Sequence, residues 1–200
     1  MIASRDGIFK HPNKLVKLAN RIDYSNVGYV RGVRSKPVHE IDKELFESVN
    51  TKILSCFYPD TKIEFFARTY FQKNEYDIND GWVHQDNCMI TGIVYLNPDN
   101  TSGTSLYNIK DNCSLDVLDQ NRKQDYFKNY NKYSEEQKKE IQQLKIKNNS
   151  MFYKTVSFSG EYNRLVAFDG KMFHSSEIQE KNKERLILIS FIEQIKVVND

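Results

Sequence analysis

The sequence predicts a mainly β domain, an α+β arrangement in which helices pack against one face of a jelly roll. Two amphipathic helical segments come first, and many short strand-like segments separated by turns follow them. The chain also contains 12 Tyr and 12 Phe, so aromatic residues reach 12% while hydrophobic residues reach only 39%. Large aromatic side chains bury much area each and favour strands, which supports a sheet-rich core.

The bulk composition limits the classes of function. A chain of 200 residues suits one domain, taken here as 1–200, and a net charge of only +2 predicts no nucleic-acid surface. The N-terminus "MIASRDGIFK" has no apolar core of a secretory signal, and no apolar run reaches the roughly 18–20 residues of a membrane helix. Cys56, Cys88 and Cys113 form no CxxC pair, so we expect reduced thiols in a cytoplasmic protein.

The first 60 residues are predicted to be a helical support for the sheet. Apolar residues recur at helical spacing in residues 8–22 and again in 38–56, with a polar loop between the two segments. The apolar positions are Leu15, Leu18, Ala19 and Ile22 in the first segment and Ile41, Leu45, Val49, Ile53 and Leu54 in the second.

The remainder of the chain is rich in predicted strands. Aromatic and branched residues, alternating patterns or continuous apolar runs mark these segments, and polar turns separate them. They are residues 62–71, 81–87, 88–97, 104–108, 151–160, 163–170, 172–178 and 184–195.

Residues 109–150 interrupt this pattern with a polar, charged and helix-prone segment. Ser134 followed by Glu136 and Gln137 indicates a helix start. We interpret the segment as a helical insertion of one or two exposed helices, which serves either as a solvated surface lobe or as a lid or partner surface. We expect it to shape substrate access, so that its deletion would spare cofactor binding.

The stretch "GWVHQDN" places His84 and Asp86 two positions apart. Residues i and i+2 of a strand point to the same face, so both side chains would project together while Gln85 turns away. Alone, the pair is also typical of a hydrogen-bonded surface patch. His174, in "AFDGKMFHSSE", supplies a third candidate, and two imidazoles with one carboxylate form the facial triad that suits Fe(II).

The other two histidines fit a metal site less well. His11 precedes Pro12 at a predicted helix start, and His39 lies at the start of the second helical segment. We expect both to be surface or capping residues.

Arg185 begins the apolar run "RLILISFI". A guanidinium at the edge of a buried strand needs an anion, because burying an unpaired charge is costly. The partner could be a protein carboxylate such as Glu184 or Glu193. Alternatively, Arg185 could clamp a ligand carboxylate with two hydrogen bonds.

In this order, these motifs resemble the Fe(II)/2-oxoglutarate-dependent oxygenases, and especially their prolyl-hydroxylase-like branch. "TGIVYLN" resembles the strand after the HxD motif, and "SGTSLY" resembles the next turn and strand, although Ser102 stands where a first Gly is usual. "NRLVAFDGKMFHSSE" and "ERLILISFIEQI" resemble the segments that carry the second His and the Arg. The likeness covers about residues 62–108 and 151–195, and the whole chain resembles small bacterial and phage members of the superfamily.

The resemblance implies a double-stranded β-helix, cupin-like, and it assigns roles to individual residues. His84, Asp86 and His174 would hold the iron, and Arg185 would pair with the distal carboxylate of 2-oxoglutarate. Three further residues would contact or line the cosubstrate site: Tyr95, Tyr70 and Thr91. We interpret Asn163 and Arg164 as structural, and Trp82 as a wall residue if its strand is regular.

The implied reaction is a hydroxylation. It uses Fe(II), 2-oxoglutarate and O2, releases succinate and CO2, and oxidises a C–H bond of a primary substrate. The prolyl-hydroxylase likeness favours a peptidyl or amino-acid side chain as that substrate, while small metabolites and nucleic-acid bases stay open. Two alternatives remain: a cupin-like binding or structural protein with an inactive metal site, and an iron enzyme that uses no keto acid. The sequence makes no prediction of oligomeric state.

Overall fold

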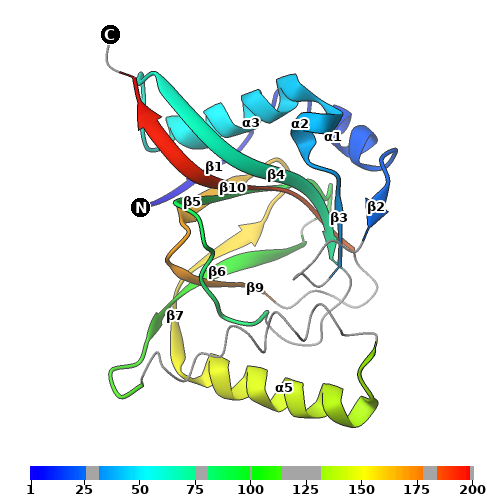
Figure 1. Ribbon diagram of the computed structural model, residues 1–200, viewed down its shortest axis with the longest axis vertical. Helices are drawn as coiled ribbons and strands as arrows, with labels where there is room; N and C mark the ends of the chain where they lie inside the picture. Colours follow the sequence, from blue (N-terminus) through cyan, green and yellow to red (C-terminus); the bar gives the residue numbers. More distant parts are fainter. Residues whose placement is uncertain (26–31, 75–80, 100, 114–131, 178–183, 199–200) are drawn as a thin grey trace.

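The protein forms two β-sheets with helices at both ends (Figure 1). The computed structural model describes residues 1–25, 32–74, 81–99, 101–113, 132–177 and 184–198. The larger sheet has seven strands in the order β1-β8-β5-β10-β4-β3-β2, and the smaller has three in the order β7-β6-β9. All described strand pairs are antiparallel, so the predicted jelly roll of double-stranded β-helix type is confirmed.

The elements follow one another along the chain with these bounds. The strands are β1 (Ile2–Arg5), β2 (Tyr24–Ser25), β3 (Val33–Ser35), β4 (Ile63–Asn74), β5 (Ile90–Tyr95), β6 (Thr101–Ile109), β7 (Phe152–Gly160), β8 (Leu165–Asp169), β9 (Phe173–Ser176) and β10 (Arg185–Val197). The helices are α1 (Pro12–Ala19), α2 (Val38–Ile41), α3 (Lys43–Ser55) and α5 (Glu135–Ser150).

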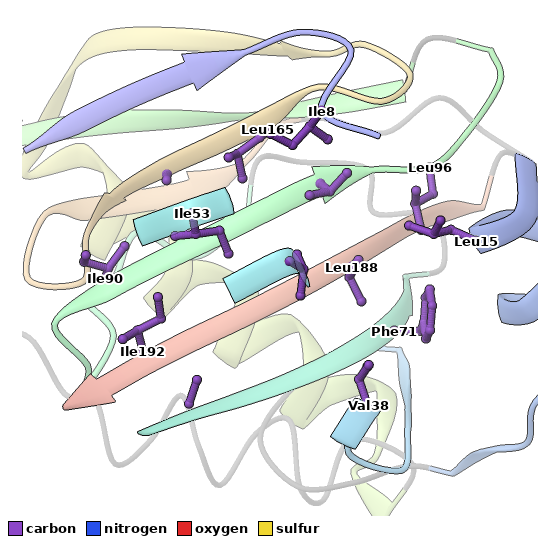
Figure 2. Close-up of a cluster of buried hydrophobic side chains, with 14 of the residues drawn as sticks. Ile8, Leu15, Val38, Ile53, Phe71, Ile90, Leu96, Leu165, Leu188 and Ile192 are labelled. Carbon is purple, nitrogen blue, oxygen red and sulfur yellow. The ribbon is translucent and has the colours of Figure 1, made fainter. Parts of the chain in front are cut away.

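The N-terminal helices cover the outer face of the larger sheet, where the main core lies. Figure 2 shows Ile53 of α3 above the strands that carry Ile90, Leu188 and Ile192. The approach is close: a Cβ added to Gly92 on β5 would lie 2.4 Å from Cδ1 of Ile53. A glycine there lets the helix reach the sheet and seal this face with buried apolar area.

A second apolar cluster fills the space between the two sheets. It contains Ile93 and Tyr95 of β5, Ile187 and Ile189 of β10, and Leu106 of β6. These strand residues alternate with those of the main core, as a sheet buried on both faces requires. The inner face of the larger sheet therefore looks onto the smaller sheet, and the candidate site lies on this inner side.

The helical predictions need two corrections. The segment 38–56 is two helices, because Asp42 adopts an extended conformation and its side chain accepts a hydrogen bond from the Leu45 amide at 2.9 Å. Asp42 thus caps the N-terminus of α3 and ends α2, which the apolar spacing alone could not reveal. The helix predicted at 8–22 spans only Pro12–Ala19.

Three strand predictions also need correction. The first 60 residues are more than a helical support, since β1 pairs with β8 and β3 pairs with β4. The stretch 81–87 is no continuous strand; His84 forms one isolated bridge within it. β6 begins at Thr101 rather than at residue 104, because it pairs along most of its length with β7.

The helical insertion is confirmed over its second half. Ser134 caps α5: its hydroxyl accepts from the Gln137 amide at 3.2 Å, and Gln137 Oε1 accepts from the Ser134 amide at 2.9 Å. α5 lies at the end of the molecule opposite α1, α2 and α3 (Figure 1). Residues 114–131, the first half, lie outside the described residues. Within the described parts of the chain, no helix is both long and apolar enough to cross a membrane.

Candidate functional site

The three predicted metal ligands lie together. One ligand atom from each of His84, Asp86 and His174 lies within 4.8 Å of the other two. His84 Nε2 is 3.7 Å from Asp86 Oδ1, and His174 Nε2 is 3.3 Å from Asp86 Oδ2. Two imidazole nitrogens and one carboxylate thus face one point, the donor set of a 2-His-1-carboxylate iron site.

Both imidazoles are held with the same nitrogen turned inward. Nδ1 of His84 is 2.7 Å from the carbonyl of Trp82, and Nδ1 of His174 is 2.9 Å from the carbonyl of Met172. A carbonyl can only accept, so each Nδ1 carries the proton when the ring is neutral. The lone pair is then left on Nε2, so a metal would be bound through Nε2 of both rings.

Asp86 is held as a carboxylate. Thr91 Oγ1 donates to Asp86 Oδ2 at 2.6 Å, while the two imidazoles lie beside the same group. Burial alone would raise the pKa of Asp86, but the charges of His174 and His84 and the hydrogen bonds from His174 and Thr91 lower it below its usual range. The group therefore stays ionised, as a metal ligand must be.

Backbone pairing brings the distant ligands together. The His84 amide donates to the His174 carbonyl at 3.0 Å, and the His174 amide donates back at 2.8 Å. The Asp86 amide donates to the carbonyl of Gly170, in the turn between β8 and β9, at 2.8 Å. A Cβ on Gly170 would lie 2.5 Å from the Cys88 carbonyl, so only glycine lets this turn approach the ligand segment.

The end of α5 holds the segment before His84. Asn149 Oδ1 accepts from the Val83 amide at 2.9 Å, and its Nδ2 donates to the Gly81 carbonyl at 2.9 Å. Asn148 Nδ2 donates to the Val83 carbonyl at 3.1 Å. The predicted insertion thus supports the metal ligands at its C-terminal end, and removing all of 109–150 would remove this support.

Arg185 lies on the strand that forms the centre of the larger sheet. Its guanidinium is buried and donates to carbonyl oxygens of Ser102 at 3.0 Å and Gly103 at 3.3 Å, and to Thr104 Oγ1 at 3.2 Å. It also lies 5.3 Å from the ring centroid of Tyr95. All of these groups are neutral.

The protein carboxylates considered as partners of Arg185 are engaged elsewhere. Glu193 pairs with Arg68, and Glu184 Oε1 lies 3.2 Å from Lys73 Nζ. No carboxylate among the described residues pairs with Arg185. Its buried charge thus has no compensating anion among the described residues, which favours a ligand carboxylate as the partner.

Neutral hydroxyl groups surround this arginine. The buried Tyr95 hydroxyl donates to Thr104 Oγ1 at 2.8 Å, and burial raises the pKa of Tyr95, so the phenol keeps its proton. Thr104 already accepts from Tyr95 and Arg185, which leaves its own proton for another acceptor. Ser102 Oγ is buried and has no hydrogen-bond partner within the described residues.

The other predicted site residues lie along the same inner face. Thr91 contacts Asp86 directly, and Tyr70 packs against the cluster between the sheets. Gln85 is exposed and donates to the Lys171 carbonyl, so it turns away from the ligands as predicted. Trp82 is buried, and its carbonyl orients His84.

Several contributors were missed by the sequence reasoning. They are Ser102, Thr104, Asn148 and Asn149. The first two lie in the quoted "SGTSLY". The sequence analysis had already singled out this turn and strand, and that match could have identified them. The asparagines offered no signal, since their contacts join residues 65 to 68 positions apart.

Residues expected to be peripheral are so placed. His11 is the N-cap residue of α1 but makes no capping hydrogen bond, and His39 is exposed on α2. Asn163 exchanges two hydrogen bonds with the backbone of Phe9, and Arg164 pairs with Asp6. Both tie the N-terminal segment to the sheet, as their structural interpretation predicted.

The fold is that of the Fe(II)/2-oxoglutarate oxygenases. Over 96% of this chain, it is similar to a structure of HygX from Streptomyces hygroscopicus with nickel and 2-oxoglutarate bound, at 10% identity, TM-score 0.60 and 83% coverage of that chain. A 2OG-Fe(II) oxygenase family oxidoreductase from Burkholderia pseudomallei matches at 10% identity and TM-score 0.55, over 96% of this chain and 84% of that one. A prolyl hydroxylase from Trichoplax adhaerens, in complex with a hypoxia inducible factor peptide fragment, matches at 12% identity and TM-score 0.54, over 96% and 83%.

The family assignment comes from the sequence itself. The chain belongs to the family of unknown function DUF6445, whose model matches residues 2–185. No curated protein matches the sequence. The matched residues include the three candidate metal ligands and end at Arg185.

Proposed function

We propose that the protein is an Fe(II)- and 2-oxoglutarate-dependent dioxygenase that hydroxylates a C–H bond of a primary substrate. One observation carries the proposal. On the inner side of a double-stranded β-helix, a facial set of two histidines and an aspartate accompanies a buried arginine without a carboxylate partner among the described residues. The first would bind the metal, and the second would bind the cosubstrate.

The donor set fits Fe(II). In the neutral form of each ring, the carbonyl beside Nδ1 leaves the Nε2 lone pair of His84 and of His174 available to a metal, and Asp86 is ionised. Three protein ligands would leave other coordination positions free for small molecules. Free coordination positions distinguish a catalytic metal site from a structural site, in which protein ligands fill every position.

The arginine end fits the distal carboxylate of 2-oxoglutarate. Arg185 would supply the charge, and the Thr104 hydroxyl has a proton to donate. Tyr95 would act through Thr104 by fixing the direction of that proton. Two positive charges on the metal and one on Arg185, less one on Asp86, balance the two negative charges of the keto acid.

When bound, the iron and keto acid would supply the oxidation, with O2 consumed and succinate and CO2 released. The chain contributes position and a dry environment. Phe168 lies 4.7 Å from the His174 ring, between ring centroids, and belongs to the apolar cluster between the sheets. Thr91 keeps the Asp86 carboxylate oriented through its hydrogen bond.

The substrate class is proposed more loosely. A peptidyl or amino-acid side chain is favoured, since one neighbour is a prolyl hydroxylase solved with a peptide fragment. HygX has been solved with hygromycin B, so small molecules also suit this fold. We further expect a cytoplasmic location, because Cys56, Cys88 and Cys113 are all free thiols.

The direct test measures binding of 2-oxoglutarate to the Fe(II)-loaded protein in the absence of oxygen. The visible charge-transfer absorption of the complex reports the binding. Succinate release after oxygen is added measures turnover. His174→Ala should abolish the absorption through loss of metal, and Arg185→Glu should abolish it through repulsion of the keto acid. Gln85→Ala is the matched control between two ligands, and it should behave as wild type.

Each alternative has its own result. A wild-type protein that binds no transition metal would indicate an inactive site in a binding or structural protein. Binding of Fe(II) with no spectral response to 2-oxoglutarate would indicate an iron enzyme that uses no keto acid. Intact binding in both variants would refute the site assignment.

A further inference from the structure

Arg34 on β3 is a second arginine on the inner side of the larger sheet. Its Nε donates to Gln72 Oε1 at 2.7 Å, and its guanidinium carbon lies 5.3 Å from the ring centroid of Tyr70 and 5.1 Å from that of Phe191. Two aromatic rings and one amide therefore fix the plane of the group. Stacking of this kind holds an arginine in place while leaving its terminal nitrogens able to donate.

No carboxylate within the described residues pairs with Arg34. Its side-chain contacts are with the neutral groups of Gln72, Tyr70 and Phe191. Burial lowers the pKa of Arg34 to about 10, and the charge of Asp86 only partly opposes that effect. The guanidinium remains charged at neutral pH, and no anion among the described residues is in direct contact with it.

This arginine lies beside the metal end of the site. Phe191, which it contacts, is the cross-strand partner of Thr91, and Thr91 donates to Asp86. Tyr70 and Phe191 also pack on the cluster that includes Phe168, whose ring contacts His174. Arg34 and the metal ligands thus share one side of the sheet, separated by neighbouring side chains.

The balance of charge leaves one positive charge over. The proposed metal, Asp86, Arg185 and the keto acid sum to zero. Arg68, the nearby cation that lowers the pKa of Arg34 further, is already paired with Glu193. Among the described residues near the metal end, Arg34 is then the positive charge without a paired acid, which matches a monoanion.

We propose that Arg34 binds a carboxylate of the primary substrate and so selects monoanionic, carboxylate-bearing molecules. The inference rests on the proposed function, because it assumes an iron site. The substrate carboxylate would lie beside the iron and would not be one of its ligands. A planar guanidinium whose terminal nitrogens donate to no described residue matches a carboxylate through two parallel hydrogen bonds. Arg34 is thereby a substrate-binding residue, distinct from Arg185, which serves the cosubstrate.

The experiment uses the full chain loaded with Zn(II) and 2-oxoglutarate, so that no turnover occurs. The probes are matched pairs of N-acetyl amino acids and their C-terminal amides, which differ only in the carboxylate. Binding is followed by NMR of 15N-labelled arginine side chains, with the Arg34 signal assigned from its loss in Arg34→Gln. Arg68→Gln is the control, since it removes a nearby arginine that is already paired.

We expect at least one acid to shift the Arg34 signal and to bind about tenfold or more tightly than its amide, as charge-assisted hydrogen bonds imply. The preference should disappear in Arg34→Gln, recover in part in Arg34→Lys and persist in Arg68→Gln. Binding of 2-oxoglutarate to the loaded protein should be unchanged in all three.

Two results would overturn the inference alone. One is that no acid shifts the Arg34 signal, or that acids and amides bind equally, while 2-oxoglutarate still binds the metal-loaded protein. The other is that Arg34→Gln weakens 2-oxoglutarate binding, which would make Arg34 a cosubstrate residue. Failure of the wild-type protein to bind metal or 2-oxoglutarate would instead overturn the proposed function. A melting temperature close to that of wild type shows that each variant is folded.

Discussion

The two ends of the candidate site are built differently. At the metal end, the segment of His84 and Asp86 is short and irregular: one isolated bridge joins His84 to His174 of β9, and a turn carbonyl holds the Asp86 amide. The arginine end rests on long strands, since Arg185 begins β10 and Thr104 lies within β6. The metal end therefore depends on side-chain supports, whereas the arginine end is positioned by the sheet itself.

This difference separates two kinds of fragility. Backbone pairing along β10 involves many hydrogen bonds, so losing one contact there changes little. The segment 81–87 has few pairing partners, and Asn148 and Asn149 of α5 supply several of them. Changes near the metal should alter metal affinity, and changes near Arg185 should alter cosubstrate affinity alone.

The largest effect is expected from the ligands. His174→Ala removes one of three metal-binding atoms, so Fe(II) affinity should fall by about 100-fold or more, since even supporting residues cost 10- to 100-fold. Isothermal titration with Fe(II) under nitrogen measures this. His39→Ala, at an exposed histidine, should bind as wild type, and a normal affinity in His174→Ala would contradict the metal centre.

The second effect should be confined to the arginine end. Arg185→Gln removes the charge that faces neutral groups only, so 2-oxoglutarate affinity should fall by about 10- to 100-fold, as for a lost charge-assisted hydrogen bond. Fe(II) affinity should stay within a factor of about two. Titration of the Fe(II)-loaded protein measures both, with exposed Arg5→Gln as control. An equal loss of Fe(II) would show that the two ends are not independent.

A smaller effect is expected at the carboxylate ligand. Thr91→Val keeps the volume and removes the hydroxyl that donates to Asp86, so Fe(II) affinity should fall by about tenfold. Thr155→Val, which removes a hydroxyl that donates to the Leu106 carbonyl on the smaller sheet, is the matched control. Equal affinities in the two variants would mean that Thr91 does not orient the ligand.

The smallest effect tests the support from α5. Asn149→Ala removes two hydrogen bonds to the segment before His84, at about 1 kcal/mol each in stability. Fe(II) affinity should fall a few-fold, and 2-oxoglutarate affinity should not change. Thermal unfolding and Fe(II) titration measure the two parts, with exposed Gln143→Ala as control. Unchanged Fe(II) affinity would make α5 a surface lobe, as one sequence interpretation held.

Local chemistry explains which predictions were confirmed. The cap at Ser134 could be predicted because a capping box involves only residues three positions apart. The break at Asp42 was missed because apolar spacing continued through it, although the same capping chemistry decided it. β1 was missed because a four-residue edge strand carries too little pattern, and its pairing with β8 depends on residues about 160 positions away.

The sequence by itself predicted the fold class, which the structure confirmed, and a candidate ligand set. Residue identity and spacing indicated the strands and the candidate donors, and the resemblance to the Fe(II)/2-oxoglutarate oxygenases assigned the expected roles of His84, Asp86, His174 and Arg185. The tertiary structure alone decided the partners: that Glu184 and Glu193 pair elsewhere, that asparagines of α5 hold the segment before His84, and that Arg34 is stacked without an acid among the described residues. The reason is physical. The energy of a buried charge depends on the groups around it once water is excluded, and those groups come from distant parts of the chain.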